Sequence, residues 1–199
     1  LSDSLNLLLG IRFDEMDFDL DDAKSNANDG SDSDSTISPR IGLTFDVTSQ
    51  AMLYAAYSES FAPKAGDQYA SLSFKDSGGT TRNESNTSVL DPDSFENIEF
   101  GIKFDLTDGL TLSAAYFEIE ANKPELINGS GATQMVNSQN KGFEIELYGM
   151  VTDNWFLSAG YTSLDAKAND GDRLREAPEN MFSVWNNYLV SDRLALNLG

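Results

Sequence analysis

The sequence of 199 residues contains no cysteine and no histidine, and its 13 lysines and arginines are outnumbered by 33 aspartates and glutamates. The missing side chains argue against disulfide scaffolds, Cys/His zinc sites and catalysis by a histidine or cysteine. A formal net charge of −20 repels phosphate and argues against nucleic acid as a partner. No apolar run of about 18 residues is present, which rules out a helical membrane span. We therefore expect no enzyme, no catalytic residue and no cofactor.

Proline is scarce, with five residues against 15 glycines, and this balance suits strands and turns. Hydrophobic residues make up 40% of the chain and aromatic residues 11%, so the composition is not that of a disordered protein. Leu1 is not a start methionine, and no secretory signal is visible. We therefore expect a processed, trimmed or fragmentary chain, whose missing signal says nothing about its compartment.

The dominant hydrophobic period is two residues, which is typical of strands with one apolar and one polar face. In segment 97–106, apolar side chains alternate with Asn, Glu, Gly, Lys and Asp. No segment of helical length shows an apolar stripe at helical spacing. The pattern predicts an all-β chain with nine strands, at about 5–13, 38–47, 51–59, 95–106, 110–121, 139–150, 155–166, 179–190 and 194–199. In segment 179–190 the register stays open, because Val184 and Trp185 each fit the apolar face.

Short and long connections alternate strictly between these strands. The short ones have turn-forming sequences such as Thr-Asp-Gly, and the long ones cover about 14–37, 60–94, 122–138 and 167–178. All short turns therefore lie at one end of an up-and-down sheet and all long loops at the other. This arrangement is typical of an antiparallel transmembrane β-barrel of the outer membrane. A soluble β-sandwich also alternates in hydrophobicity, but its crossover connections break the order of short and long connections.

In such a barrel, lipid contacts the apolar face of each strand and the lumen contacts the polar face. Barrel closure also removes the unpaired strand edges that hydrocarbon cannot tolerate. The charged residues expected to line the lumen include Glu99, Lys103, Asp105, Glu144 and Glu146. They either contact a domain inside the barrel or form ion pairs along a hydrated wall.

Four segments resemble the barrel of TonB-dependent outer-membrane receptors, in that family's order. They are SPRIGLTFDVTSQAMLYAAYSESFAPKAGDQYASL (38–72), LDPDSFENIEFGIKFDLTDGLTLSAAYFEIE (90–120), NKGFEIELYGMVTDNWFLSAGYTSLDA (140–166) and REAPENMFSVWNNYLVSDRLALNLG (175–199). The sequence of residues 58–72 is most similar to that of catecholate-type ferric siderophore receptors. The resemblance implies a barrel of about 22 strands with an N-terminal plug domain. We expect residues 1–199 to be a single segment of that barrel, with about nine of its strands, no plug, and the four long loops outside the cell.

The resemblance further implies a function in the bacterial cell outer membrane, where such receptors take up a ferric siderophore with energy from TonB. The implied partners are the ferric siderophore, TonB through the missing plug, and outer-membrane lipid and lipopolysaccharide. Three alternatives remain open: a receptor for another cargo, a passive porin-like barrel, and a soluble all-β module that binds through cation-dependent loops.

Loop 60–94 carries the predicted ligand site, because it combines aromatic faces with positive charges in an acidic chain. A ferric catecholate complex is anionic and rimmed by aromatic rings, which suits contacts with Arg, Lys and Tyr. The predicted ligand-binding residues are Phe61, Lys64, Gln68, Tyr69 and Arg82. The alternative is that the aromatic residues only pack the loop against the barrel rim.

Loop 14–37 is strongly acidic and is a second candidate site. Clustered carboxylates suit Ca²⁺, and such a loop can also join neighbouring lipopolysaccharide through shared cations. It lacks the glycine and glutamate that define an EF-hand loop, so we assign no metal ligands to it. The alternative is a solvated surface loop.

Overall fold

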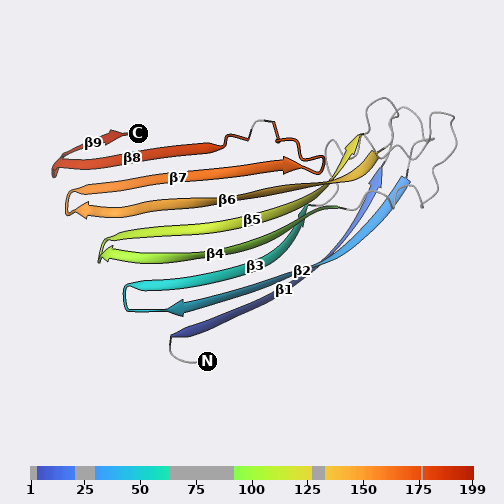
Figure 1. Ribbon diagram of the computed structural model, residues 1–199, viewed down its shortest axis with the longest axis horizontal. Coiled ribbons are helices and arrows are strands. Elements are labelled where there is room, and N and C mark those ends of the chain that lie inside the picture. The colour runs from blue at the N-terminus through green and yellow to red at the C-terminus, as the bar shows by residue number, and fades with distance from the viewer. Residues whose placement is uncertain (1–3, 21–29, 63–91, 127–132, 176) are drawn as a thin grey trace.

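The computed structural model describes residues 4–20, 30–62, 92–126, 133–175 and 177–199. Within these residues the regular structure is entirely β, as predicted. One antiparallel sheet contains the strands in chain order, each beside the next (Figure 1). The strands are β1 (Leu5–Leu20), β2 (Gly30–Asp46), β3 (Ala51–Ala62), β4 (Asp93–Thr107), β5 (Leu110–Leu126), β6 (Thr133–Thr152), β7 (Trp155–Ala168), β8 (Asn180–Ser191) and β9 (Leu194–Leu198).

The short turns all lie at one end of the sheet, which we call the turn end, and the opposite end is the loop end (Figure 1). Side-chain oxygens stabilise these turns. The Gln50 N–H donates to Thr48 Oγ1 at 3.1 Å, and the Gly109 N–H donates to Thr107 Oγ1 at 3.3 Å. Threonine hydroxyls satisfy backbone donors that no strand partner reaches.

Two of the long loops, predicted at 14–37 and 122–138, are shorter in the structure. Residues 14–20 and 30–37 are strand, paired from Asp14–Thr36 to Leu20–Gly30, and β5 and β6 likewise extend to Leu126 and from Thr133. Ser and Asp are poor strand formers, so their abundance after residue 13 predicted a loop. In the structure, however, the backbone hydrogen bonds between β1 and β2 continue through this segment. The boundaries predicted for loops 60–94 and 167–178 agree with the strand ends at Ala62, Asp93, Ala168 and Asn180 to within three residues.

The strand register places the apolar side chains on one face, because directly opposed residues share a face. Rings of Phe100 and Tyr116 stack across β4 and β5 at 5.1 Å between centroids. Large apolar side chains of this face are open to the surroundings; Ile11, for example, is 78% exposed. One row of partners crosses seven strands: Leu7, Leu43, Ala55, Phe100, Tyr116, Phe143 and Ser163.

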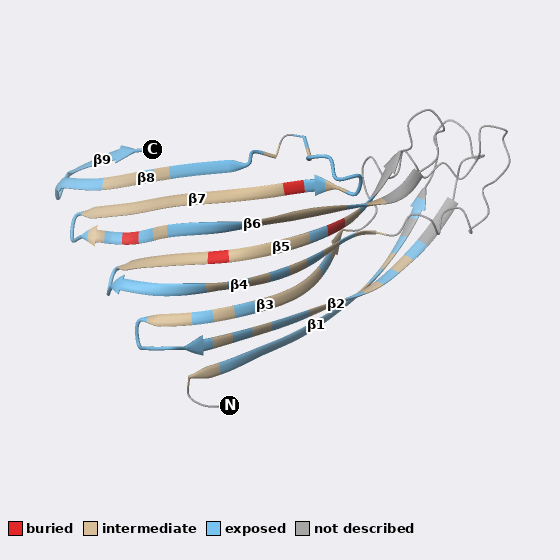
Figure 2. Ribbon diagram, viewed as in Figure 1, coloured by how far each residue is buried: buried red, intermediate tan, exposed pale blue. Residues whose placement is uncertain are grey.

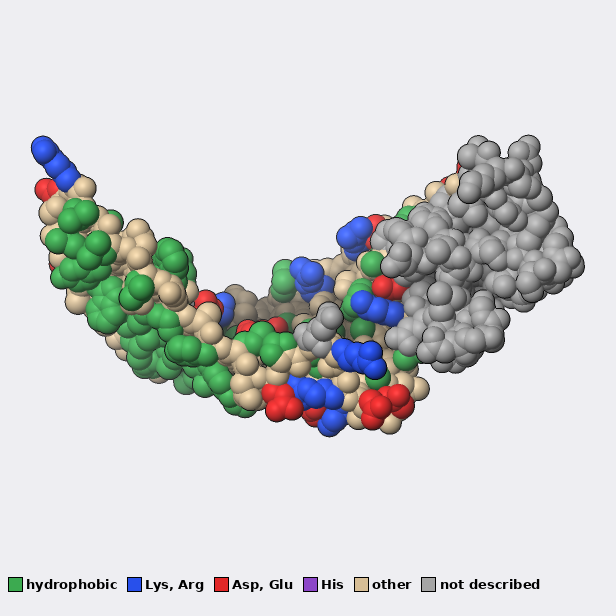
Figure 3. Space-filling view, turned by 90° about the horizontal axis from the view of Figure 1, so that it is seen from above, with side chains coloured by type: hydrophobic (Ala, Val, Ile, Leu, Met, Phe, Trp, Pro, Cys, Tyr) green, Lys and Arg blue, Asp and Glu red, His purple; other side chains and the backbone are tan. Residues whose placement is uncertain are grey.

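The sheet curves, and the hydrophobic side chains gather along its convex side (Figure 3). Among the described residues, the buried hydrophobic side chains are three alanines, Ala115, Ala121 and Ala166. Most of the described sheet is coloured as intermediate or exposed (Figure 2). No second layer of the described chain therefore covers the convex face. No described helix is long and apolar enough to cross a membrane.

The open register in β8 is resolved. Val184 lies opposite Ala159 on the convex face, and Trp185 lies opposite Ser158 on the concave face. In the described part of the chain, β1 pairs only with β2 and β9 pairs only with β8. The sheet is accordingly an unclosed part of a barrel.

Candidate functional site

The candidate site is a groove at the loop end, where β2 separates from β3. The two strands pair only as far as Arg40–Ser58, although both continue beyond this pair. The next residue of β2 is Pro39, which has no backbone N–H to extend a ladder. Beyond it, β2 stays with β1 and leaves a groove of about 300 Å³. The groove is lined by Gly10, Ile11, Arg12, Ser38, Arg40, Glu59, Ser60 and Phe61.

Arg12 of β1 and Phe61 of β3 meet across this groove. The guanidinium carbon of Arg12 lies 6.0 Å from the centroid of the Phe61 ring, within the range of a cation–π contact. Arg12 also donates from Nε and Nη2 to Asp14 Oδ1, at 2.9 and 2.6 Å. The Arg12 side chain is nonetheless 73% exposed, so its charge is held in position and remains open to a ligand.

A second cation–aromatic pair lies nearby on the same rim. The Lys123 ammonium is 5.1 Å from the centroid of the Phe95 ring and 4.0 Å from Asp93 Oδ2. Phe95 and Phe61 line one common pocket between the ends of β2 and β5. This rim therefore presents two positive charges, each beside an aromatic face, which suits an anionic ligand with aromatic or planar groups.

Of the predicted ligand residues, the structure describes only Phe61, which lies in the groove. The other four, Lys64, Gln68, Tyr69 and Arg82, lie outside the described residues. Arg12 and Lys123 were not predicted. A signal was present, because each has the sequence parity of the polar face. Arg12 lies near the loop end of the predicted strand 5–13, and Lys123 lies just beyond the predicted strand 110–121.

The predicted lumen residues share the concave face. Tyr54 donates to Glu99 Oε1 at 2.6 Å, and the Lys103 ammonium lies 5.8 Å from the centroid of the Tyr54 ring. Nearer the turn end, Lys103, Asp105 and Glu146 line one pocket with Asp46. The concave wall is therefore polar and carries charges of both signs.

The acidic segment offers no assembled cation site in its described part. No group of three or more carboxylates with metal-binding geometry occurs within residues 4–20, 30–62, 92–126, 133–175 and 177–199. The Ca²⁺ hypothesis for 14–37 thus gains no support from these residues, and 21–29 lie outside them.

The model of the family "TonB dependent receptor-like, beta-barrel" matches residues 1–198. The chain belongs to this family. Known TonB-dependent receptors of two bacteria resemble it over nearly its whole length. It is 25% identical to the probable TonB-dependent siderophore receptor PiuA of Acinetobacter baumannii, over 96% of this chain and 28% of that protein. It is 27% identical to the ferripyoverdine receptor of Pseudomonas aeruginosa, over 94% of this chain and 22% of that protein.

Solved structures of TonB-dependent receptors share the fold. The ferric-catecholate import receptor Fiu of Escherichia coli K12, in its closed form, superposes with a TM-score of 0.75. That match has 22% identity and covers 98% of this chain and 31% of the other. The siderophore receptor PiuA of Acinetobacter baumannii gives a TM-score of 0.72 at 27% identity, over 98% of this chain and 30% of the other. The chain spans about a quarter of the length of the curated relatives it matches.

As a TonB-dependent receptor barrel, the chain belongs in the bacterial outer membrane. Its relatives are transport receptors and not enzymes. This membership explains the two faces of the sheet. Hydrocarbon contacts the exposed apolar convex face, and the polar concave face lines the interior.

Proposed function

We propose that this chain is a single barrel segment, residues 1–199, of a receptor that takes up a ferric siderophore of the catecholate type. In this proposal the loop end faces outside the cell, and the turn end faces the periplasm. The relatives named above support a ferric siderophore as the cargo, since their names include a siderophore receptor and a ferripyoverdine receptor.

The pairing of Arg12 with Phe61 is the observation that carries the proposal for this chain. A ferric catecholate is anionic, and its rim consists of flat aromatic rings. The exposed guanidinium attracts the charge, and the Phe61 ring offers a face for stacking. Lys123 and Phe95 repeat this combination on the neighbouring strands.

Further contacts would come from loop 60–94, with Lys64, Gln68, Tyr69 and Arg82 in that role. Transport itself requires a plug and TonB, which act through the remainder of the receptor. The polar concave wall around Glu99 and Lys103 suits a hydrated interface with such a plug, because polar surfaces separate at lower cost than apolar ones.

The test is ligand binding by the full-length receptor in detergent, with ferric catecholate and ferric hydroxamate chelates compared. The double variant Arg12→Gln with Phe61→Leu should bind the ferric catecholate at least about tenfold more weakly, from two lost contacts of roughly 1 kcal/mol each. Arg193→Gln, at the opposite end of the sheet, is the matched control and should bind normally. Unchanged affinity in the double variant would refute the groove as a contact site. Stronger binding of the hydroxamate would reassign the cargo.

A further inference from the structure

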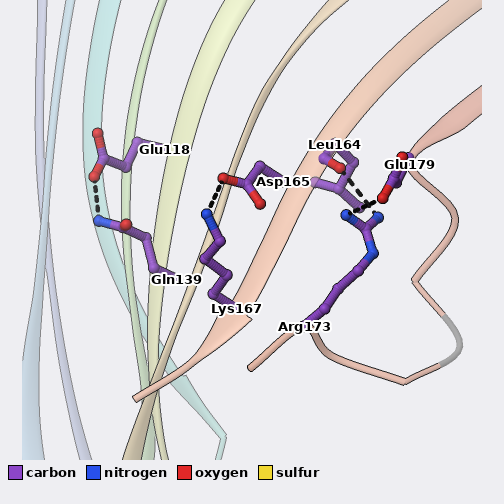
Figure 4. Close-up of polar contacts among 7 residues, drawn as sticks. All are labelled: Glu118, Gln139, Leu164, Asp165, Lys167, Arg173 and Glu179. Atoms are coloured by element: carbon purple, nitrogen blue, oxygen red, sulfur yellow. Dashed lines mark hydrogen bonds and ion pairs between the residues drawn. The ribbon is translucent and has the colours of Figure 1, made fainter. Parts of the chain in front are cut away.

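The interior wall is uncharged along the last three strands of the sheet. No aspartate, glutamate, lysine or arginine occurs in residues 155–164 of β7, in β8 or in β9. The charged residues of β7, Asp165 and Lys167, lie at its loop end, where Lys167 donates to Asp165 Oδ2 at 2.7 Å (Figure 4). Asp192 and Arg193 lie in the turn between β8 and β9. The concave wall therefore has a neutral part, although the chain has a net charge of −20.

The neighbouring strands β2 to β6 carry the charges of the concave wall. Between the groove and the turn end, carboxylates outnumber cations on this face. The charged residues there are Arg40, Asp46, Glu99, Lys103, Asp105, Glu144 and Glu146. An anion inside the barrel is repelled by this acidic part and can approach the neutral strands β7 and β8 more closely.

Aromatic rings cover the neutral part near the turn end. The rings of Tyr148 and Phe156 meet edge to face, with 5.1 Å between their centroids. Tyr148 and Trp185 both lie opposite Ser158 in the ladders, so they are two strands apart, at about 10 Å, with a small side chain between them. We call Tyr148, Phe156, Ser158 and Trp185 the aromatic shelf.

The shelf is open to the interior. Tyr148 is 55% exposed and Trp185 is 50% exposed. A Cβ atom on Gly199 would come within 2.6 Å of the Trp185 ring, so the ring packs along the backbone just after β9. Beside Phe156 in the ladder, Asn187 donates to Asn197 Oδ1 at 2.6 Å. Aromatic faces next to neutral amides and a hydroxyl suit a planar aromatic group that carries oxygen atoms.

We propose that the aromatic shelf is a second, weaker binding site for the cargo on its way to the periplasm. The proposal rests on the proposed function, because the ligand is the aromatic rim of a ferric catecholate. The groove at the loop end combines a ring with a cation, whereas the shelf offers stacking without a charge. The shelf therefore holds an anionic complex less tightly than the groove does.

A weak second site suits passage through the barrel. A path conducts when its sites are favourable enough to be entered and weak enough to be left. A complex released from the groove rebinds there unless it is held further along the path. The shelf lies near the opposite end of the strands and holds the complex by ring contacts alone. It thereby increases the fraction of released complexes that reach the periplasm.

The test uses cells that produce the full-length receptor and the iron(III) complex of a tricatecholate chelator, with radiolabelled iron. Surface binding in the cold measures the affinity of the outer site, and uptake at saturation measures the maximal transport rate. The double variant Tyr148→Leu with Trp185→Leu should bind with unchanged affinity and transport about fivefold more slowly, which is the loss expected from two weak aromatic contacts.

The matched control is Trp155→Leu with Tyr188→Leu. These two residues are direct partners near the same end of β7 and β8, but they lie on the convex face. The control removes the same two types of ring without changing the interior, so each receptor at the cell surface should transport normally. Tyr148→Phe with Trp185→Phe keeps a ring at both positions of the shelf. It should retain most of the transport, which shows that the loss in the leucine variant is not caused by misfolding.

Unchanged maximal transport in the leucine variant would overturn the shelf, as would an equal loss in the phenylalanine variant. Raised entry of an antibiotic too large for a closed receptor, without cargo present, would also overturn it, because the rings would then seat the plug. If the wild-type receptor does not bind the tricatecholate complex, the cargo of the proposed function is wrong, and the shelf falls with it. Normal binding with unchanged transport in the leucine variant would refute the shelf alone.

Discussion

Tyr54 lies directly opposite Gly101 across β3 and β4, and its ring covers the space that a side chain at position 101 would fill. A Cβ atom on Gly101 would come within 2.8 Å of the Tyr54 ring and 2.5 Å of the Ala114 carbonyl oxygen. The ring can therefore lie flat against the concave wall, from where its hydroxyl reaches Glu99 at 2.6 Å. The contact between Tyr54 and Glu99 therefore requires a glycine at position 101.

The substitution Gly101→Ala should destabilise the receptor by about 1–3 kcal/mol, the usual cost of forcing atoms into a filled space. The Ala114 backbone cannot move without disturbing its own ladder. Urea unfolding of the receptor in detergent measures the change. Gly42→Ala is the control, because its Cβ would meet Leu8 at an ordinary 3.5 Å. Equal stability of the two variants would contradict the steric account.

Removal of the Tyr54 hydroxyl should also weaken the concave wall. Tyr54→Phe leaves the Glu99 carboxylate without this donor, at a cost of about 1 kcal/mol once solvent exposure is taken into account. The matched variant Tyr161→Phe loses a hydrogen bond to the neutral Asn180 at an exposed position and should cost less. The same unfolding assay compares them. A larger loss at Tyr161 would show that the charged acceptor adds nothing.

Aromatic character at Phe61 should matter to ligand affinity separately from its volume. Phe61→Leu removes the ring beside Arg12, whereas Phe61→Tyr keeps it. Cation–π contacts at exposed sites contribute about 0.5–1 kcal/mol, so we expect a two- to fivefold weaker ferric catecholate complex for leucine alone. Equilibrium binding to the full-length receptor provides the measurement. A parallel loss in both variants would point to packing of the phenylalanine and not to its ring.

The membrane-spanning parts of the strands were predictable from the sequence, because one face of each strand contacts hydrocarbon and the other contacts water. These two environments require apolar and polar residues to alternate, as they do in segment 97–106, which lies within β4. Beyond Phe13 the first hairpin leaves the apolar band, and no lipid imposes alternation on pairs such as Asp17–Ser33. The local sequence then resembles a loop, although the backbone ladder persists.

The groove was not predictable in the same way. The groove forms where the pairing of β2 with β3 ends. The hydrophobic pattern of a single strand does not indicate where its pairing with a neighbour ends. Arg12 and Phe61 are far apart in sequence, and only Phe61 was predicted to contact the ligand. The predicted contacts Lys64, Gln68, Tyr69 and Arg82 remain predictions.

The register of β8, which the sequence left open, gives a direct test of the two faces. Val184 lies on the convex face opposite Ala159, and its neighbour Ser183 lies on the concave face opposite Gly160. Val184→Lys should therefore reduce the free energy of folding into lipid vesicles by about 2–4 kcal/mol, since lysine would enter hydrocarbon. Ser183→Lys keeps its charge in the wet interior and should cost little. A slip by one residue would exchange the two results, because every side chain of the strand would change face.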